Sequence, residues 1–309
     1  MKTVVITGAD GFIGSHLVHY FADRGVEVYA LVVKKSPVRH CIEHLKHVVV
    51  VEGDLTNRDS LIPALPVEAD AFFHLAWAGV APEHRNSIDI QMENVGLCIS
   101  AARLAAAIGA KRFIMPGSTM EYMYSGGNIN ASSLPSPQNA YGAAKISARY
   151  LCQSLCEELA LPFIYVVITG IYSADRTDNN VIYYTISSLL KGERPSLTKL
   201  EQLWDYVHID DVVAAFGAVA EKGRPGGFYT IGHGDNWPLS NYIYQIRDII
   251  NPSLELGIGE VPYKNECLPS SCVDLGPLIR DTGFKPQIPF HEGIKEVIRV
   301  VRETMEAAK

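Results

Sequence analysis

The sequence lacks several features that would have decided its class at once. No apolar run approaches the roughly 20 residues of a membrane-spanning helix, so no membrane partner is expected. The first residues lack the apolar core and small-residue cleavage site of a secretory signal. Cysteine is sparse, with six in 309 residues and none in a C-x-x-C pair. These absences predict a cytoplasmic protein with reduced thiols, without a disulfide framework or a metal site.

Positive charge is also in short supply. The chain has 27 Lys and Arg against 34 Asp and Glu, a formal net charge of −7. No more than two basic residues follow one another, whereas nucleic-acid binders carry a basic face, so no nucleic-acid partner is expected. Glycine (25) and proline (17) are at ordinary levels, which excludes a collagen-like or low-complexity chain.

What the chain does have is an alternation of short apolar segments and helical ones over its first 170 residues. The apolar segments are continuous, which is typical of strands buried on both faces of a parallel sheet between helices. Right-handed crossovers then give a doubly wound, Rossmann-type α/β sheet. The expected strands cover residues 4–6, 26–33, 48–51, 71–75, 112–115 and 163–168, and the expected helices cover 13–22, 85–108 and 141–159.

This rhythm breaks after residue 170. The length alone suggests about two domains. We predict a Rossmann domain over residues 1–170 and a smaller mixed α/β lobe over residues 171–206 and 233–309. Residues 207–232 are predicted to return to the first domain. The later expected elements are helices at 178–190, 211–221 and 290–307 and strands at 206–209 and 228–231.

A glycine cluster follows the first strand and opens the first helix. Its spacing is G-x-x-G-x-x-G. Glycine here permits a tight turn and a close approach of the backbone to a pyrophosphate, which the free N–H groups of the helix N-terminus then bind. The position predicts a dinucleotide site, to which we assign Gly8, Asp10, Gly11, Phe12, Ile13 and Gly14.

The end of the second strand bears on the choice of cofactor. An acidic residue there binds the ribose 2′-OH of NAD, whereas a nearby cation accommodates the 2′-phosphate of NADP. The strand ends without an acid and continues into Lys34 and Lys35, so NADP is preferred; NAD stays open, because the two lysines can equally form a solvated turn. Asp54 and Leu55, after the third strand, are assigned to the adenine, although an aspartate there can instead cap a helix.

Together these motifs resemble the extended short-chain dehydrogenase/reductases, the NAD-dependent epimerase/dehydratase group of nucleotide-sugar epimerases, dehydratases and 4-ketoreductases. The resemblance covers nearly the whole chain. It implies an enzyme that binds NAD(P) and a nucleotide-sugar, with Leu75, Ala76 and Trp77 beside the cofactor and a homodimer paired through helices 85–108 and 141–159. The motifs that carry it are the glycine cluster, Asp54-Leu55, His74-Leu75-Ala76, Ser118, Tyr141-x-x-x-Lys145, and residues 206–211 and 228–232.

The residues predicted to be catalytic are Ser118, Tyr141 and Lys145. Tyr141 and Lys145 are four apart at the start of a helix, so they share one face. An ammonium beside a phenol lowers the pKa of the phenol, which suits a general acid or base. Ser118 ends the fifth strand, where ligands bind in an open α/β sheet, and can hold the reacting oxygen while hydride passes to or from the cofactor.

The residues after Ser118 discriminate among reactions. Family dehydratases carry an acid pair there, whereas this chain has Thr119 and Met120. The pattern G-S-x-x-E-Y resembles reductases of nucleotide-linked 4-keto-6-deoxy sugars, and this is the predicted activity. A nucleotide-sugar 4-epimerase with tightly bound NAD is the alternative. A reductase of other ketones or aldehydes and a non-catalytic NADP-binding regulator are further readings, although a regulator has no need of the acid/base residues.

The residues predicted to bind substrate are Ser118, Thr119, Arg176, Asn180 and Trp204. Asn180 resembles a substrate-facing position of the family. Trp204 stands where the family often has an arginine for the sugar-nucleotide phosphates, so it either stacks on the substrate or packs in the core. The diphosphate contact is then left to Arg176, Arg194 or Arg280.

Overall fold

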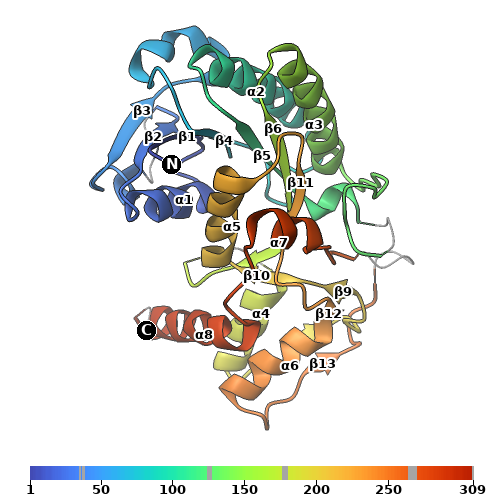
Figure 1. The fold of residues 1–309 in the computed structure, drawn as a ribbon. Helices are drawn as coiled ribbons and strands as arrows, with labels where there is room; N and C mark the ends of the chain where they lie inside the picture. Colours follow the sequence, from blue (N-terminus) through green and yellow to red (C-terminus); the bar gives the residue numbers. More distant parts are fainter. Residues whose placement is uncertain (35, 37–38, 124–126, 176–179, 264–269, 308–309) are drawn as a thin grey trace.

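A seven-stranded parallel sheet forms the larger part of the protein (Figure 1). The computed structural model describes residues 1–34, 36, 39–123, 127–175, 180–263 and 270–307. The strand order is β11-β6-β5-β4-β1-β2-β3, which confirms the predicted doubly wound α/β fold. The strands are β1 (Thr3–Thr7), β2 (Glu27–Val32), β3 (Val48–Glu52), β4 (Ala71–His74), β5 (Phe113–Ser118), β6 (Phe163–Ile168) and β11 (Phe228–Ile231).

Helices cover both faces of this sheet, with α1 (Phe12–Ala22) and α5 (Ile209–Lys222) on one side and α2 (Ile88–Ala107) and α3 (Ala140–Glu158) on the other. Alternate residues of each strand enter opposite cores. Phe72 packs towards α2 and α3, whereas Phe73 packs towards α1 and α5. Because both faces are buried, the strands read as continuous apolar runs.

Helices α2 and α5 begin two or three residues from their predicted starts, and a specific hydrogen bond accompanies each difference. The expected helix 85–108 begins at Ile88, because the Arg85 carbonyl accepts a hydrogen bond from the Tyr141 amide and so lies in a connecting loop. The expected helix 211–221 begins at Ile209, because the His208 side chain caps it by accepting from the Asp210 amide. Pattern alone does not show such caps.

A second group of elements lies below the sheet in Figure 1 and has its own apolar core. Its helices are α4 (Val181–Leu190), α6 (Leu239–Ile250) and α8 (Phe290–Ala307). Its strands form pairs: β7 (Gly170–Tyr172) with β10 (Tyr206–His208), β8 (Ser196–Leu197) with β13 (Gly257–Ile258), and β9 (Leu203–Trp204) with β12 (Trp237–Pro238). The expected strand 206–209 thus pairs outside the large sheet, whereas β11 joins it beside β6.

The remaining elements are short. Helix α7 (Gly276–Thr282) packs against β11 and α5. The 3-10 turns are η1 (Arg39–Cys41), η2 (Leu55–Ser60), η3 (Ile62–Ala64) and η4 (Thr119–Glu121). The buried Asp211 carboxylate of α5 accepts from the amides of Gln287 and Ile288, which fixes the chain just before α8.

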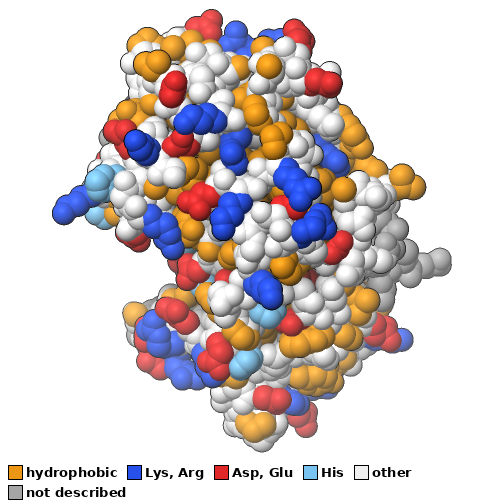
Figure 2. All heavy atoms as spheres, in the orientation of Figure 1, with side chains coloured by type: hydrophobic (Ala, Val, Ile, Leu, Met, Phe, Trp, Pro, Cys, Tyr) orange, Lys and Arg blue, Asp and Glu red, His pale blue; other side chains and the backbone are white. Residues whose placement is uncertain are grey.

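Surface and helix composition give two further observations. On the face shown in Figure 2, Lys and Arg side chains are interspersed with Asp, Glu and apolar side chains. Among the helices of the described ranges, none combines the length and the apolar character that crossing a bilayer requires.

Candidate active site

The glycine cluster lies at the point where the strand order reverses, between β1 and β4. Ligands of open α/β sheets bind at such a point, beyond the carboxyl ends of the strands. Gly8 has a φ of +62°, and a Cβ there would lie 2.7 Å from the Ala76 amide nitrogen. A Cβ on Gly14 would lie 2.0 Å from the Gly8 carbonyl oxygen. Glycine is therefore required for the turn and for the close packing of the backbone around it.

The N-terminus of α1 suits an anion. Gly11 is its N-cap residue and has no side chain to accept from the first amides, whereas N-cap residues usually do so. Those amides and the positive end of the helix dipole fit a pyrophosphate. Gly11, Phe12 and Ile13 would hold this group, so the start of α1 fits the pyrophosphate of a dinucleotide.

The loop after β4 is fixed by helix α2. The Trp77 indole donates to Gln91 Oε1 at 3.0 Å, and the Gln91 amide donates to the Gly79 carbonyl at 3.1 Å. Asn94 both accepts from the Ala78 amide and donates to its carbonyl, each at 2.9 Å. Gln91 and Asn94 were not singled out from the sequence. Their signal was two polar residues on the buried face of α2, whose other buried residues are apolar.

Beneath this loop, His74 ends β4 in the core. Its Nδ1 is hydrogen-bonded to Thr7 Oγ1 at 2.8 Å, across the β1–β4 pair. Burial, helped by the charge of Lys145, lowers the pKa of His74 to about 3. The ring is thus neutral at physiological pH and ties together the ends of two strands.

The three residues predicted to be catalytic come together at the carboxyl ends of β4 and β5. Asn139 caps α3 by accepting from the Gly142 amide at 2.8 Å. A Cβ on Gly142 would lie 2.5 Å from the Met120 carbonyl oxygen, so α3 starts hard against η4. Tyr141 is half-buried there, close enough to the Ser118 side chain for Ser118 to influence its pKa.

Lys145 lies one turn further along α3, and its side chain is buried. Its ammonium donates to the Pro116 carbonyl at 3.1 Å and lies 3.7 Å from the centre of the Trp77 ring. The Trp77 and Tyr141 rings meet edge to face, 5.8 Å apart. Trp77 was predicted beside the cofactor, and the structure places its indole directly against both α3 residues.

The protonation of Tyr141 differs from the expectation that Lys145 lowers its pKa. Burial and the charge of Glu121 raise the pKa of Tyr141 to about 12, although the hydrogen bond with Ser118 acts against them. Burial lowers the pKa of Lys145 to about 8. The Lys145 nitrogen is also 5.8 Å from the Tyr141 ring centre. The four-residue spacing correctly predicted that Tyr141 and Lys145 share one face of the helix. Their pKa values, however, are determined mainly by burial.

The segment after Ser118 turns its acid away from the open site. Ser118 Oγ accepts from the Met120 amide and caps η4. Thr119 is buried, so its contact with a substrate stays a prediction. Glu121 is fully buried and points into the core, where it accepts from the Tyr165 hydroxyl.

The residues predicted to bind the adenosine part lie further along the sheet. Leu55 is buried, and the exposed Asp54 accepts from the Thr56 amide at 2.8 Å, which is the helix-cap alternative. This hydrogen bond lowers the pKa of Asp54. Lys34 is exposed just after β2, whereas Lys35 lies outside the described residues. The adenine and phosphate contacts stay predictions.

On the substrate side, Asn180 and Trp204 line one pocket of about 480 Å³. A Cβ on Gly170 would lie 2.9 Å from the Trp204 indole nitrogen, and Gly170 follows β6, whose Ile168 is in register with Ser118. The pocket thus lies along the chain that leaves the catalytic edge of the sheet. Its walls are mainly apolar and include Val181, Tyr184, Leu197, Leu200, Tyr206, Leu239 and Val261.

The three arginines proposed for the diphosphate contact differ in whether they are described and in how they are paired. Arg176 lies outside the described residues. Arg194 pairs with Glu255 and Glu260, and Arg280 pairs with Asp281. The pairing of Arg194 could not be read from the sequence, because its partners are more than 60 residues away in the chain.

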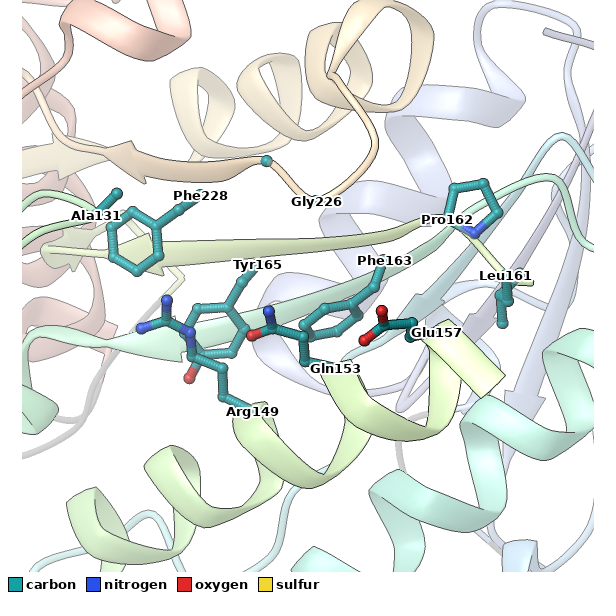
Figure 3. Close-up of a pocket in the computed structure, with 11 residues that line it drawn as sticks. Ala131, Arg149, Gln153, Glu157, Leu161, Pro162, Phe163, Tyr165, Gly226 and Phe228 are labelled. Atoms are coloured by element: carbon teal, nitrogen blue, oxygen red, sulfur yellow. The ribbon is translucent and has the colours of Figure 1, made fainter. Parts of the chain in front are cut away.

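A second pocket, of about 430 Å³, lies between α3, β6 and β11 (Figure 3). Arg149, Gln153 and Glu157 of α3 face Tyr165 and Phe228 across it. None of the predicted site residues lines it, so it is separate from the catalytic cluster.

Across the described ranges, no three His, Cys, Asp or Glu residues form a group that could hold an ion. The described cysteines, which are Cys41, Cys98, Cys152, Cys156 and Cys272, are free thiols.

Comparison with known proteins identifies the family of this chain. Residues 4–232 match the model of the NAD dependent epimerase/dehydratase family. A dTDP-D-glucose 4,6-dehydratase of Dictyostelium discoideum is 28% identical over 82% of this chain, but the match spans only 63% of that protein. A GDP-6-deoxy-D-mannose reductase of Pseudomonas aeruginosa is 23% identical over 96% of both chains.

Among solved structures, a UDP-N-acetylglucosamine 4-epimerase of Methanobrevibacter ruminantium has the same fold. Its TM-score is 0.85, with 22% identity over 98% of this chain and 99% of that one. The family match covers most of the chain and confirms the resemblance drawn from the motifs. The chain therefore belongs to the NAD-dependent epimerase/dehydratase family and is an enzyme of the extended short-chain dehydrogenase/reductase type.

Proposed function

We propose that this enzyme reduces the keto group of a nucleotide-linked 4-keto-6-deoxy sugar. One observation carries the choice: no carboxylate occupies positions 119 and 120, directly after Ser118, although Tyr141 and Lys145 are both present. A protonated phenol is a general acid, as ketone reduction requires. Water elimination by a dehydratase would need the acids that are missing. The Pseudomonas relative named as a reductase is consistent with this choice.

Three side chains have separate roles in the proposed reduction. The Ser118 hydroxyl holds the carbonyl oxygen, and Tyr141 donates its proton to that oxygen as the alcohol forms. Lys145 supplies a nearby cation that stabilises the tyrosinate left behind. A bound nicotinamide dinucleotide supplies the hydride to the carbonyl carbon. One hydride and one proton thus convert the ketone to an alcohol.

The substrate is proposed to enter the pocket of Asn180 and Trp204. The Asn180 side chain already caps α4 by accepting from the Tyr183 amide, which holds it at the pocket wall. Trp204 offers an aromatic surface for a base or sugar. A panel of nucleotide-linked 4-keto-6-deoxy sugars, varied in the base and supplied with NADPH, tests the proposal. Loss of NADPH with at least one member supports it, whereas tightly held NAD and no loss with any member would favour the 4-epimerase.

The proposed cofactor is NADP, with Lys34 at its 2′-phosphate. Lys34 is exposed beyond β2, and the strand end offers no acid to the ribose. We expect Lys34→Glu to weaken NADPH binding by about 10-fold or more, because a local cation becomes an anion. NADH binding should change little. Titration of both cofactors checks this, with Lys46→Glu as the surface control; equal effects on NADPH and NADH would remove Lys34 from the phosphate site.

We also propose a homodimer formed through α2 and α3. Both helices expose large apolar side chains: 64% of Ile88 and 62% of Met92 on α2, and 52% of Tyr150 and 49% of Leu151 on α3. Grouped apolar surface of this kind marks association sites. Sedimentation at micromolar concentration should give a dimer, and Leu151→Glu should shift it to the monomer. A wild-type monomer under these conditions would refute the dimer.

A further inference from the structure

Glu121 is a buried acid that the proposed reaction does not use. Its Oε1 accepts two hydrogen bonds, from the Ser118 amide at 2.6 Å and from the Tyr165 hydroxyl at 2.8 Å. The Ser118 side-chain oxygen in turn accepts from the Met120 amide at 3.2 Å. This reciprocal capping box closes the short turn η4 directly behind the predicted catalytic serine.

The backbone makes room for this contact. A Cβ on Gly117 would lie 2.5 Å from both Glu121 Oε1 and the Tyr165 hydroxyl oxygen. The residue before Ser118 must therefore be glycine for the carboxylate to reach under the strand. Tyr165 is held in turn, since its ring lies 5.1 Å from the Arg149 guanidinium at the pocket in Figure 3.

Keeping a carboxylate here has a cost. Glu121 has no solvent exposure, and among the described residues its second oxygen has no hydrogen-bond partner. Burial raises the pKa of Glu121 to about 7. Moving an ionised carboxylate out of water carries a large desolvation penalty. The burial of Glu121 therefore indicates a role other than stabilising the fold.

We propose that Glu121 is a positioning residue that fixes the Ser118 backbone at the end of β5. With the amide of Ser118 held by the carboxylate and its Oγ held by η4, the hydroxyl keeps one direction, towards Tyr141. Glu121 thus acts through Ser118 and touches no reacting atom. The kinetic consequence of this proposal rests on the proposed reduction, whereas the hydrogen bond itself does not.

Two substitutions separate the hydrogen bond from the rest of the side chain. Glu121→Gln keeps an oxygen that can accept from Ser118 and Tyr165, whereas Glu121→Val removes the acceptor and leaves an apolar side chain. We expect Glu121→Val to lower kcat by about 10–100-fold with KM within about 2-fold, because small misplacements of catalytic groups have effects of that size. Glu121→Gln should stay within about 3-fold of the wild type. Glu157→Gln, an exposed position of α3, is the control.

Two measurements need no substrate. In protein labelled with ¹⁵N-serine, the Ser118 amide proton should resonate at low field, as expected for a short hydrogen bond to a carboxylate. It is identified by its loss in Ser118→Thr. It should move to high field in Glu121→Val and much less in Glu121→Gln. Urea unfolding at pH 8 should show Glu121→Val to be less stable than the wild type but fully folded without urea, because the Ser118 amide and the Tyr165 hydroxyl lose their acceptor.

The outcomes are distinct. A normal kcat in Glu121→Val, or an equal loss of kcat in Glu121→Val and Glu121→Gln, would overturn the positioning role. An unmoved Ser118 amide signal in Glu121→Val would also overturn it. If the amide shifts as expected but the wild type reduces no 4-keto sugar, the proposed function fails and the positioning of Ser118 stands.

Discussion

Replacing Tyr141 by phenylalanine should lower kcat for ketone reduction by about 10²–10⁴-fold, the usual contribution of a general acid. The variant keeps the aromatic ring and with it the edge-to-face contact with Trp77, whose centre is 5.8 Å away. It removes the one proton that the site offers to the carbonyl oxygen in the proposed mechanism. Cofactor affinity should therefore change little, so the loss appears in kcat under saturating NADPH.

Tyr150→Phe is the matched control for this experiment. Tyr150 lies on the same helix but is 52% exposed and distant from the predicted site. It should keep the wild-type kcat. The pH profile adds a second check, because a protonated Tyr141 with a pKa near 12 predicts no alkaline fall in kcat from this residue below about pH 10. If Tyr141→Phe kept full activity, the proton would have to come from elsewhere and the mechanism would be wrong.

The second large effect is expected from Gly14→Ala. The added Cβ would lie 2.0 Å from the Gly8 carbonyl oxygen, which is backbone and cannot swing aside. The turn must move, and amides of the α1 N-terminus then lose their alignment with a pyrophosphate. Hydrogen bonds to a charged group contribute about 1.5–3 kcal/mol each. Losing one or two should weaken dinucleotide binding by about 10–100-fold or more.

A second glycine-to-alanine change controls for the substitution itself. Gly96 lies in the middle of α2, and a Cβ there would meet nothing within 4 Å. Gly96→Ala should bind NADPH normally and be slightly more stable, because alanine favours a helix by about 1 kcal/mol over glycine. Isothermal titration of both variants checks this. Wild-type affinity in Gly14→Ala would contradict the placement of the pyrophosphate at α1.

The sheet could be predicted from the sequence because its chemistry is local. Strands such as β6 are buried on both faces and read as unbroken apolar runs, and the glycine cluster sits between a strand and a helix. Ser118, Tyr141 and Lys145 could be grouped for the same reason, since strand ends and helix starts of a parallel sheet share one edge.

Other features of the site could not be predicted from the sequence, because they depend on tertiary packing. Glu121 read from the sequence only as an acid one position too late for a dehydratase, because its burial under Gly117 is set by β6 and Tyr165. The high pKa of Tyr141 also follows from burial, which a four-residue spacing does not reveal. The pairing of Arg194 with Glu260 joins residues far apart in the chain. Long-range contacts of this kind leave no local pattern.

The most direct test of the central claim follows a labelled hydride. Wild-type enzyme is mixed with a nucleotide-linked 4-keto-6-deoxy sugar and NADPH carrying deuterium at both C4 positions. The account predicts one NADPH oxidised per alcohol formed and one deuterium at C4 of the sugar. A product without deuterium, formed while added NADPH stays intact, would contradict a net reductase and indicate hydride return from a tightly held cofactor.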